Sequence, residues 1–279
     1  MIKADEALEL RRILVALDAS THSLAALEAA SRLAAELRAE LLGLFVEDVD
    51  LLQVAALPFT RTMSAQTRGE QPLDPATMER ALRVRAAQAR AALAATAERR
   101  QVRWSFRIAR GEIIDEVLSA AGRCDLVTLG KTSKASVRRA RLGGTARNAA
   151  ARASCSVLLY QEGTRLDWPI VALFDGSTRA LAVASEFARI YGTELTVLVV
   201  ASDTQTLARL RREAAAWLKR RGRAAHIRPV DRAAAAEICH AVRTEGGGLL
   251  VLDREGPLAR REDLGAMLDE LECPVLLLR

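Results

Sequence analysis

The chain carries two copies of one short pattern, and this repeat constrains the fold more than any other feature of the sequence. The segments ILVALDAS at 13–20 and IVALFDGS at 170–177 are apolar runs that end in Asp, a small residue and Ser. An Ala-rich stretch of helical character follows each copy, and a second apolar run follows each of these, at 39–46 and at 193–200. Such self-similarity indicates a chain built from two related units.

The rest of each half also alternates between apolar runs and helical stretches. The runs are nearly continuous in Val, Leu and Ile, which is typical of parallel strands that are covered on both faces. The alternation predicts an α/β fold of two doubly wound, five-stranded parallel-sheet domains in tandem, at 1–163 and 164–279. Further strands are expected at 102–108, 125–129, 155–160, 225–230, 249–252 and 275–278, and helices at 112–121, 145–153, 233–243 and 264–271.

The first half is the longer one, and its extra residues fall mostly within an insert at about 47–99. Residues 76–99 are rich in Ala, Arg and Glu and predict a long helix. The insert has two interpretations. It is a surface excursion with a packing helix, or it is a lid over a ligand or a surface for a partner.

Composition narrows the class of protein. Half of the 279 residues are hydrophobic but only 4% are aromatic, so Ala, Leu and Val have to fill most of the core. This balance excludes disordered, collagen-like and disulfide-scaffold proteins. No apolar run approaches the roughly 20 residues that span a bilayer, and the first dozen residues carry acids without an apolar signal core. We therefore expect a cytoplasmic protein with no membrane association.

The cysteines show no pattern typical of metal or disulfide chemistry. Cys124, Cys155, Cys239 and Cys273 form no C-x-x-C pair and no cluster with ligand spacing, so no metal site is expected. Three of them precede or begin an apolar run, which favours small buried side chains in a reducing compartment. A redox pair between Cys155 and Cys273 is the alternative.

The residues that follow each strand are the candidates for a site, because ligands of open parallel α/β sheets bind beyond the carboxyl ends of the strands. Asp18 follows the first strand, directly before a helix that begins after Ser20. In one interpretation Asp18 or Ser20 simply caps that helix. In the other, the carboxylate of Asp18 stands at the mouth of a nucleotide cleft, against ribose, base or a phosphate-bound metal.

A glycine-rich, basic loop follows the fourth strand. Glycines let a backbone approach a ligand closely, and amides at the amino end of a helix favour anions. The loop is neither a Walker A motif nor a G-x-G-x-x-G fingerprint, and its glycine pair alone is equally compatible with a simple turn. The loop contains Gly130, Thr132, Ser133, Gly143, Gly144 and Thr145, and positive charge is expected from Lys131, Lys134, Arg138, Arg139 and Arg141.

In these features the chain resembles a tandem universal stress protein, over about 11–161 and 168–279. The family pattern after the fourth strand is Gly, two residues, Gly, nine residues, Gly, then Ser or Thr. Gly130 and Gly143 match this pattern, and the nine-residue spacing is kept. Ser133 replaces the second Gly, and Gly144 stands at the hydroxyl position, with Thr145 one place later.

The resemblance implies domains of the adenine-nucleotide alpha-hydrolase-like fold that bind ATP, with or without Mg. It also implies that the halves pair as a pseudo-dimer, with 157–160 near 275–278, and it leaves room for a homodimer of the whole chain. The implied adenosine site consists of Ala16, Leu17, Asp18, Val46, Leu129 and Gly130. The implied phosphate site consists of Thr132, Ser133, Gly143, Gly144 and Thr145.

The second half departs further from the family pattern. Asp175 is kept, but Asp253 stands where the first Gly belongs, and Gly256 is the match for the second. Glu255, Glu262 and Asp263 add negative charge at the place of the phosphates, and like charges there oppose binding. We therefore expect ATP in the first domain only, with the second domain as a structural or regulatory partner.

No strong catalytic constellation is present, since H-E-x-x-H and G-x-S-x-G are absent. Of the three histidines, His22, His226 and His240, we expect His22 to be solvated and His240 to have a packing or surface role. We expect a stress-response or regulatory protein rather than an enzyme, and weak ATP hydrolysis stays open. One alternative is a nucleotide-independent scaffold that contacts an unidentified protein partner, favoured by Ser133 and Gly144. The pI of about 9.6 and the basic runs ERRQVRW and KASVRRAR suggest nucleic-acid binding as a further alternative, against which the few aromatics, the missing motifs and the modest net charge of +6 argue.

Overall fold

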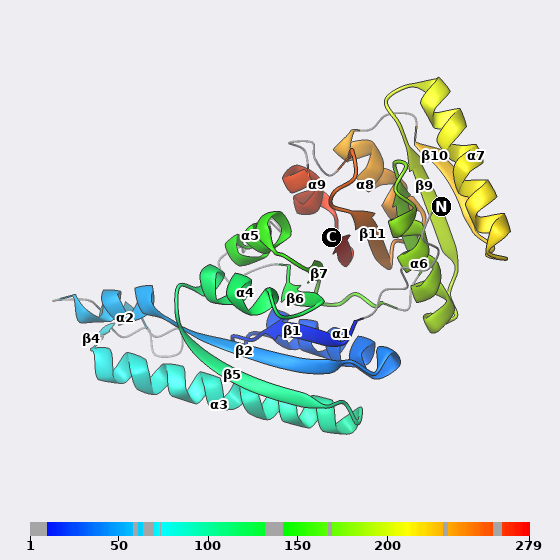
Figure 1. Ribbon diagram of the computed structural model, residues 1–279. Coiled ribbons are helices and arrows are strands. Elements are labelled where there is room, and N and C mark those ends of the chain that lie inside the picture. The colour runs from blue at the N-terminus through cyan, green and yellow to red at the C-terminus, as the bar shows by residue number, and fades with distance from the viewer. Residues whose placement is uncertain are drawn as a thin grey trace.

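The computed structural model describes residues 10–57, 61–63, 70–72, 74–131, 142–166, 169–230, 234–258 and 264–279. They form an α/β fold around one large, mainly parallel sheet (Figure 1). The strands are β1 (Arg12–Ala16), β2 (Glu40–Asp48), β5 (Trp104–Gly111), β6 (Leu126–Gly130) and β7 (Ser156–Tyr160) in the N-terminal half, and β8 (Ile170–Phe174), β9 (Leu195–Val200), β10 (His226–Val230), β11 (Leu249–Asp253) and β12 (Val275–Leu278) in the C-terminal half. Their order along the sheet is β10-β9-β8-β11-β12-β7-β6-β1-β2-β5.

Helices cover both faces of this sheet. One face is packed by α1 (Thr21–Leu37), α3 (Pro75–Arg99), α6 (Thr178–Tyr191) and α7 (Thr204–Arg220), and the other by α4 (Ile113–Ala121), α5 (Gly144–Arg152), α8 (Ala235–Thr244) and α9 (Leu264–Glu270). A short helix, α2 (Val49–Ala56), and a hairpin of β3 (Arg61–Met63) and β4 (Glu70–Pro72) precede α3. No helix in the described ranges has both the length and the apolar character that crossing a membrane requires.

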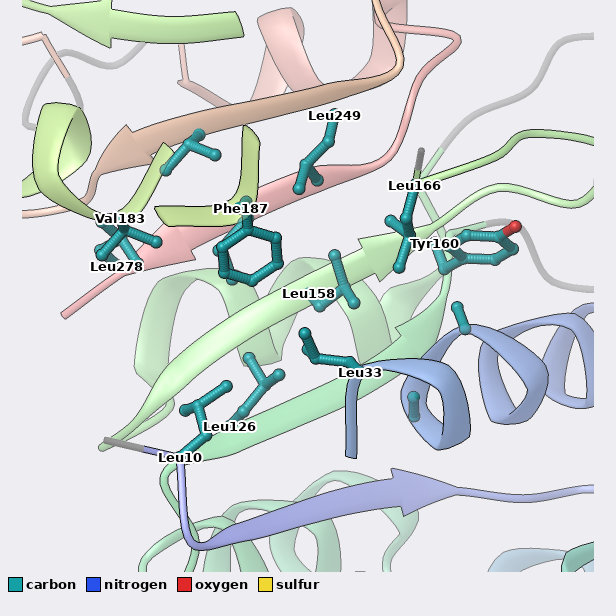
Figure 2. Packing of buried hydrophobic residues seen from close by; sticks show 14 of the residues in the cluster. Leu10, Leu33, Leu126, Leu158, Tyr160, Leu166, Val183, Phe187, Leu249 and Leu278 are labelled. Carbon is teal, nitrogen blue, oxygen red and sulfur yellow. The ribbon is translucent and has the colours of Figure 1, made fainter. Parts of the chain in front are cut away.

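The core on the α1 face is continuous through both halves. Leu33 of α1, Leu158 of β7 and Phe187 of α6 belong to one cluster of buried side chains (Figure 2). All residues of β7 and of β8 are buried, as expected for strands covered on both faces. Because the buried apolar surface stabilises the fold roughly in proportion to its area, the two halves stabilise one another through this shared cluster.

The two halves meet along one antiparallel strand pair. Leu158 of β7 lies opposite Leu276 of β12, with Val157 opposite Leu277 on one side of this pair. Every other pair of neighbouring strands in this sheet is parallel and lies within one half. The β7–β12 pair therefore joins two parallel units into one sheet. The contact expected between 157–160 and 275–278 is therefore present.

The repeated Asp-small-Ser pattern begins a helix in both halves. The Oγ of Ser20 accepts a hydrogen bond from the amide of Ser23 at the start of α1. The Oγ of Ser177 accepts one from the amide of Arg179 at the start of α6. Each serine satisfies an amide that the helix itself leaves without a partner, which explains why a hydroxyl recurs there.

The strands and helices expected from the sequence form close to their expected bounds, but the insert differs from expectation. In the C-terminal half α7 follows β9, just as α3 follows β2 in the N-terminal half. The helix at 76–99 is thus common to both halves, and most of the additional residues are those between β2 and α3. It is a packing helix, because an ideal β-carbon on Gly43 of β2 would lie 2.5 Å from Cδ2 of Leu93 on α3.

Candidate functional site

A pocket opens at the carboxyl ends of β1, β2 and β6, against the first turns of α1, α4 and α5. The chain runs from β1 to β2 on one side and later returns to place β6 on the other, so the strand order reverses here. Ligands of open α/β sheets bind at such a reversal. We call this the β1/β6 pocket. Its lining residues are Ala16, Leu17, Asp18, Ser20, His22, Ser23, Leu44, Val46, Ile113, Val117, Leu129, Gly130, Gly143, Gly144, Thr145 and Ala146.

A larger hollow lies at the opposite end of the strands, in the C-terminal half. Its volume is about 740 Å³, compared with about 160 Å³ for the β1/β6 pocket. Leu195 and His226, which begin β9 and β10, are among its lining residues. Since ligand sites of parallel sheets lie at the carboxyl ends, size does not decide between the two, and the β1/β6 pocket is the candidate.

Asp18 shapes the turn at the floor of this pocket, while Ser20 caps the helix. The Oδ1 of Asp18 accepts a hydrogen bond of 2.9 Å from the amide of Ser20. The amide of Asp18 donates to Oγ of Ser23 at 3.3 Å. Ala19 between them has a φ of 58°, a left-handed conformation that is unusual for a residue with a β-carbon. This tight turn holds the exposed carboxylate of Asp18 at the edge of the pocket.

One wall of the pocket is apolar. Leu44 and Val46 of β2 line it together with Val117 of α4 and Leu129 of β6. Ile113 begins α4 and keeps 39% of its surface exposed at the pocket. An aliphatic wall with an exposed edge suits a flat, largely apolar ring, whose burial would remove this surface from water.

The amino end of α5 supplies the polar side. Gly143 is the N-cap residue, and no side chain in the described part of the chain caps this helix. The amides of the first turn, at Gly144, Thr145 and Ala146, therefore have no intrahelical acceptor. They carry the positive end of the helix dipole, and these residues line the pocket. Amides in this arrangement bind anions such as phosphate.

Every predicted site residue that the structure describes lines this one pocket. They come from four separate segments and comprise Ala16, Leu17, Asp18, Val46, Leu129, Gly130, Gly143, Gly144 and Thr145. The other two predicted residues, Thr132 and Ser133, lie outside the described residues, as do Lys134, Arg138, Arg139 and Arg141. The structure thus places these residues around one pocket, and the site itself stays a prediction.

The prediction that Lys131 adds positive charge to the phosphate loop is wrong. Its side chain is fully buried, and Nζ donates a hydrogen bond to the backbone carbonyl of Leu271 in the C-terminal half. Burial lowers the pKa of Lys131, because the charged form loses its hydration. The side chain of Lys131 thus contacts the second half of the molecule instead of facing a ligand.

Several lining residues are not among those predicted from the sequence. His22 was expected to be solvated, but it lines the pocket and its Nδ1 lies 3.1 Å from a carboxylate oxygen of Glu162. Its position in the first turn of the helix after Asp18 could have predicted that it lines the pocket, since that turn borders the carboxyl edge of the sheet. The same signal applies to Ser20 and Ser23. The other missed residues are Leu44, Ile113, Val117 and Ala146.

At the corresponding place in the C-terminal half, the backbone of the loop after β11 packs against the carboxylate of Asp175. The Oδ2 of Asp175 accepts a hydrogen bond of 3.0 Å from the amide of Leu258. An ideal β-carbon on Gly256 would lie 2.5 Å from the same oxygen, so this loop is folded directly onto the carboxylate. The hydroxyl of Ser177 donates to Asp253. In the N-terminal half, Asp18 lines an open pocket instead.

Cysteine and metal chemistry contribute no site in the described residues. All four cysteines are buried and free, and burial raises the pKa of each thiol to about 11. These thiols stay protonated at neutral pH and behave as small apolar side chains, rather than as a redox pair. Within the same residues, no group of three or more His, Cys, Asp or Glu side chains is placed to hold a metal ion.

Comparison with known proteins identifies relatives of this architecture. Residues 9–161 match the model of the universal stress protein family. A universal stress protein from Archaeoglobus fulgidus DSM 4304 is 14% identical with a TM-score of 0.72, covering 96% of this chain and 98% of that chain. A putative universal stress protein from Pseudomonas aeruginosa UCBPP-PA14 is 18% identical with a TM-score of 0.67, covering 98% and 95%. No curated protein sequence matches the chain.

Proposed function

Because this chain belongs to the universal stress protein family, we propose that it is a stress-response protein that binds ATP or a related adenine nucleotide in the β1/β6 pocket. We further propose that only the N-terminal half binds the nucleotide. The C-terminal half is then a second, degenerate universal stress protein domain, which pairs with the first through β7 and β12 and acts as its structural or regulatory partner.

One observation carries this proposal: two equivalent places in the fold have opposite character. The β1/β6 pocket combines an aliphatic wall, a carboxylate and the uncapped amino end of α5. In the C-terminal half, the amide of Leu258 and the backbone of Gly256 occupy the space beside Asp175. Among the described residues, the carboxylate of Asp175 thus contacts its own loop, whereas Asp18 lines a pocket.

The residues of the pocket fit the parts of an adenine nucleotide. Val46 and Leu129 would lie against the base, where burial of apolar surface favours binding. Asp18 would accept hydrogen bonds from ribose hydroxyls or, with phosphates, hold a magnesium ion, which proteins commonly bind through one or two carboxylates and the phosphates of the substrate. The amides of Gly144 and Thr145 would bind phosphate oxygens.

We propose a binding protein rather than an enzyme. The imidazole of His22 lines the pocket, and its Nδ1 lies 3.1 Å from a carboxylate oxygen of Glu162. The bound nucleotide would act by changing the shape of the site and of its neighbours. We also propose that the protein is cytoplasmic and that it associates with further copies or with a protein partner. The scaffold alternative rests on Ser133 and Gly144, the two positions that depart from the family pattern.

A titration with paired variants tests the proposal. Isothermal titration of the full chain with ATP should give micromolar binding, and Asp18→Ala should weaken it by about tenfold or more, the loss of a charge-assisted contact. Asp175→Ala is the matched control, because it removes the equivalent carboxylate of the other half and should leave ATP affinity unchanged. A flat titration of the wild-type chain up to millimolar ATP would favour the scaffold. Equal losses in both variants would contradict binding by the N-terminal half alone.

A further inference from the structure

Helix α5, whose amino end faces the β1/β6 pocket, is held at that end by an acid of the C-terminal half. Asp269 of α9 accepts hydrogen bonds from Arg147 at 2.8 and 2.9 Å, one to each carboxylate oxygen. The Oδ1 of Asp269 also accepts a hydrogen bond of 2.8 Å from the backbone amide of Leu142, just before the N-cap of α5. A single carboxylate of the second half therefore contacts both the approach to this helix and its first turns.

The small residue Gly265 makes room for this contact. An ideal β-carbon on Gly265 of α9 would lie 2.9 Å from Nη1 of Arg147. The guanidinium of Arg147 thus lies directly on the backbone of α9, and its Nη2 donates to both oxygens of the Asp269 carboxylate in a charge-assisted contact.

The carboxyl end of α5 is held by a base of the same half. Arg254, which follows β11, donates to the carbonyls of Ala150 and Ala153 at 3.3 and 2.7 Å. These carbonyls lie in the last turn of α5, where the helix leaves acceptors without intrahelical partners. An acid near the amino end and a base at the carboxyl end both complement the helix dipole.

The residues that flank the glycine-rich loop, Lys131 and Gly143, are also held by hydrogen bonds. The amide of Gly143 donates to the carbonyl of Lys131 at 3.0 Å, which brings both ends of the glycine-rich loop together. The amide of Lys131 donates to Tyr160 of β7 at 2.8 Å, and its buried Nζ donates to the carbonyl of Leu271. Each end of the loop thus has one direct contact with the C-terminal half, through Leu271 and through Asp269.

From these contacts we propose that Asp269 is a positioning residue for nucleotide binding, and that the C-terminal half sets the affinity of the N-terminal pocket by orienting α5. This inference rests on the proposed function and adds its regulation. Asp269 does not line the pocket. It acts by fixing the direction in which the amides of Gly144 and Thr145 point.

The coupling works in both directions. If the contact of α9 with α5 favours nucleotide binding, nucleotide binding must strengthen that contact by the same factor. A partner or ligand that pulls α9 away from Arg147 would then release the nucleotide. The degenerate half is on this account a regulatory element that reads or sets the occupancy of the other half.

The test compares two neighbouring acids of α9 in the full chain. Asp269→Ala should weaken ATP binding by about fivefold or more, the lower end of typical coupling between sites. Asp269→Asn keeps an acceptor for the Leu142 amide and should lose less. Glu270→Ala removes the next charge along the same helix, which is exposed, and should leave affinity unchanged. Unchanged affinity in Asp269→Ala, with the wild-type chain binding ATP, overturns the inference and leaves the proposed function intact.

Hydrogen exchange of the wild-type chain gives a second readout that needs no variant. With ATP, amide exchange should slow both at 143–146 and in α9 and β12 (264–278), since the coupling is reciprocal. A contact that served stability alone would leave exchange at 264–278 unaffected by ATP. Slowing confined to 143–146 overturns the inference. Absence of any ATP effect, together with a flat titration, overturns the proposed function as well.

Discussion

The backbone of Gly130 lies directly against His22, so that an ideal β-carbon on the glycine would be 3.0 Å from Cβ and 3.1 Å from the carbonyl carbon of His22. The end of β6 thus reaches the first turn of α1 at a distance that leaves little room for a β-carbon. Gly130→Ala should push these two elements apart within the pocket. Overpacking of this kind typically costs about 1–3 kcal/mol.

We predict that Gly130→Ala weakens ATP binding by roughly fivefold or more, the equivalent of about 1 kcal/mol. Isothermal titration measures this directly. Gly122→Ala is the matched control, because a β-carbon there meets nothing closer than 3.5 Å and the residue lies outside the pocket. Equal affinity of Gly130→Ala and the wild-type chain would show that the pocket does not depend on this close approach.

Gly144 offers the opposite test, because it stands where the family pattern has Ser or Thr. No described atom lies within 4 Å of a β-carbon built on this residue, so a side chain fits without strain. Gly144→Ser should add a hydroxyl at the amino end of α5 and strengthen ATP binding by several-fold, about 0.5–1.5 kcal/mol for one hydrogen bond. Gly144→Ala controls for the loss of glycine flexibility. If the serine variant binds no better than the alanine variant, the phosphates do not reach this position.

The C-caps of the first helix in each half differ in a way that predicts stability. Arg38 ends α1 with a φ of 55°, and Gly192 ends α6 with a φ of 62°, so both are left-handed. Glycine adopts this conformation without the steric cost that a β-carbon brings. Arg38→Gly should therefore raise the free energy of unfolding by roughly 0.5–1 kcal/mol, and Gly192→Ala should lower it by about 1 kcal/mol.

Urea unfolding of both variants measures these changes. Arg38→Ala is the control, since it removes the exposed side chain but keeps the strained backbone, and it should match the wild-type chain. A gain in Arg38→Ala equal to that in Arg38→Gly would assign the effect to the arginine side chain and not to the backbone.

The pH dependence of stability should contain a contribution from Glu245, near the carboxyl end of α8. Hydrogen bonds from Arg228 at 2.7 Å and from Thr196 at 3.1 Å hold its pKa below the ordinary value of 4.5. The native state binds this proton less readily than the unfolded chain, so the stabilisation is complete above pH 4.5 and is lost as the pH falls through the lowered pKa.

We expect Glu245→Gln to be destabilised at pH 7 by roughly 1.5–3 kcal/mol, the range for hydrogen bonds to charged groups. The difference from the wild-type chain should shrink as urea unfolding is repeated below pH 4.5. A difference that stays constant with pH would contradict the role of the ionised carboxylate.

Much of the fold follows from local sequence signals. The continuous apolar runs predict the strands of the main sheet because a run with both faces covered needs no polar residue. The Asp and Ser after β1 and β8 predict the helix starts, since the hydroxyl satisfies an amide locally. Even the convergence of Asp18, Val46 and Gly143 on one pocket follows from a rule of parallel sheets, that the carboxyl ends of strands share one edge.

What could not be predicted depends on contacts between distant segments. Lys131 lies in a stretch rich in Lys and Arg that reads as a solvated loop, and its burial requires the carbonyl of Leu271, 140 residues away. The closing of the second site depends on a loop fold at Gly256 that no local pattern specifies. The helix α7 is different. Local signals do predict this helix, since Asp203 caps it and the buried residues Leu210, Ala214 and Trp217 have helical spacing. It was not predicted because the helix at 76–99 was assigned to an insert, and so no counterpart was expected in the C-terminal half.

On the proposed function, one half of this protein binds an adenine nucleotide and the other does not. Native mass spectrometry of the purified full chain, equilibrated with ATP, counts the nucleotides on each chain directly. We predict one nucleotide per chain, and none or a sharply reduced amount in Asp18→Ala at the same concentration. Wild-type chains that carry no nucleotide, or two, would contradict the account.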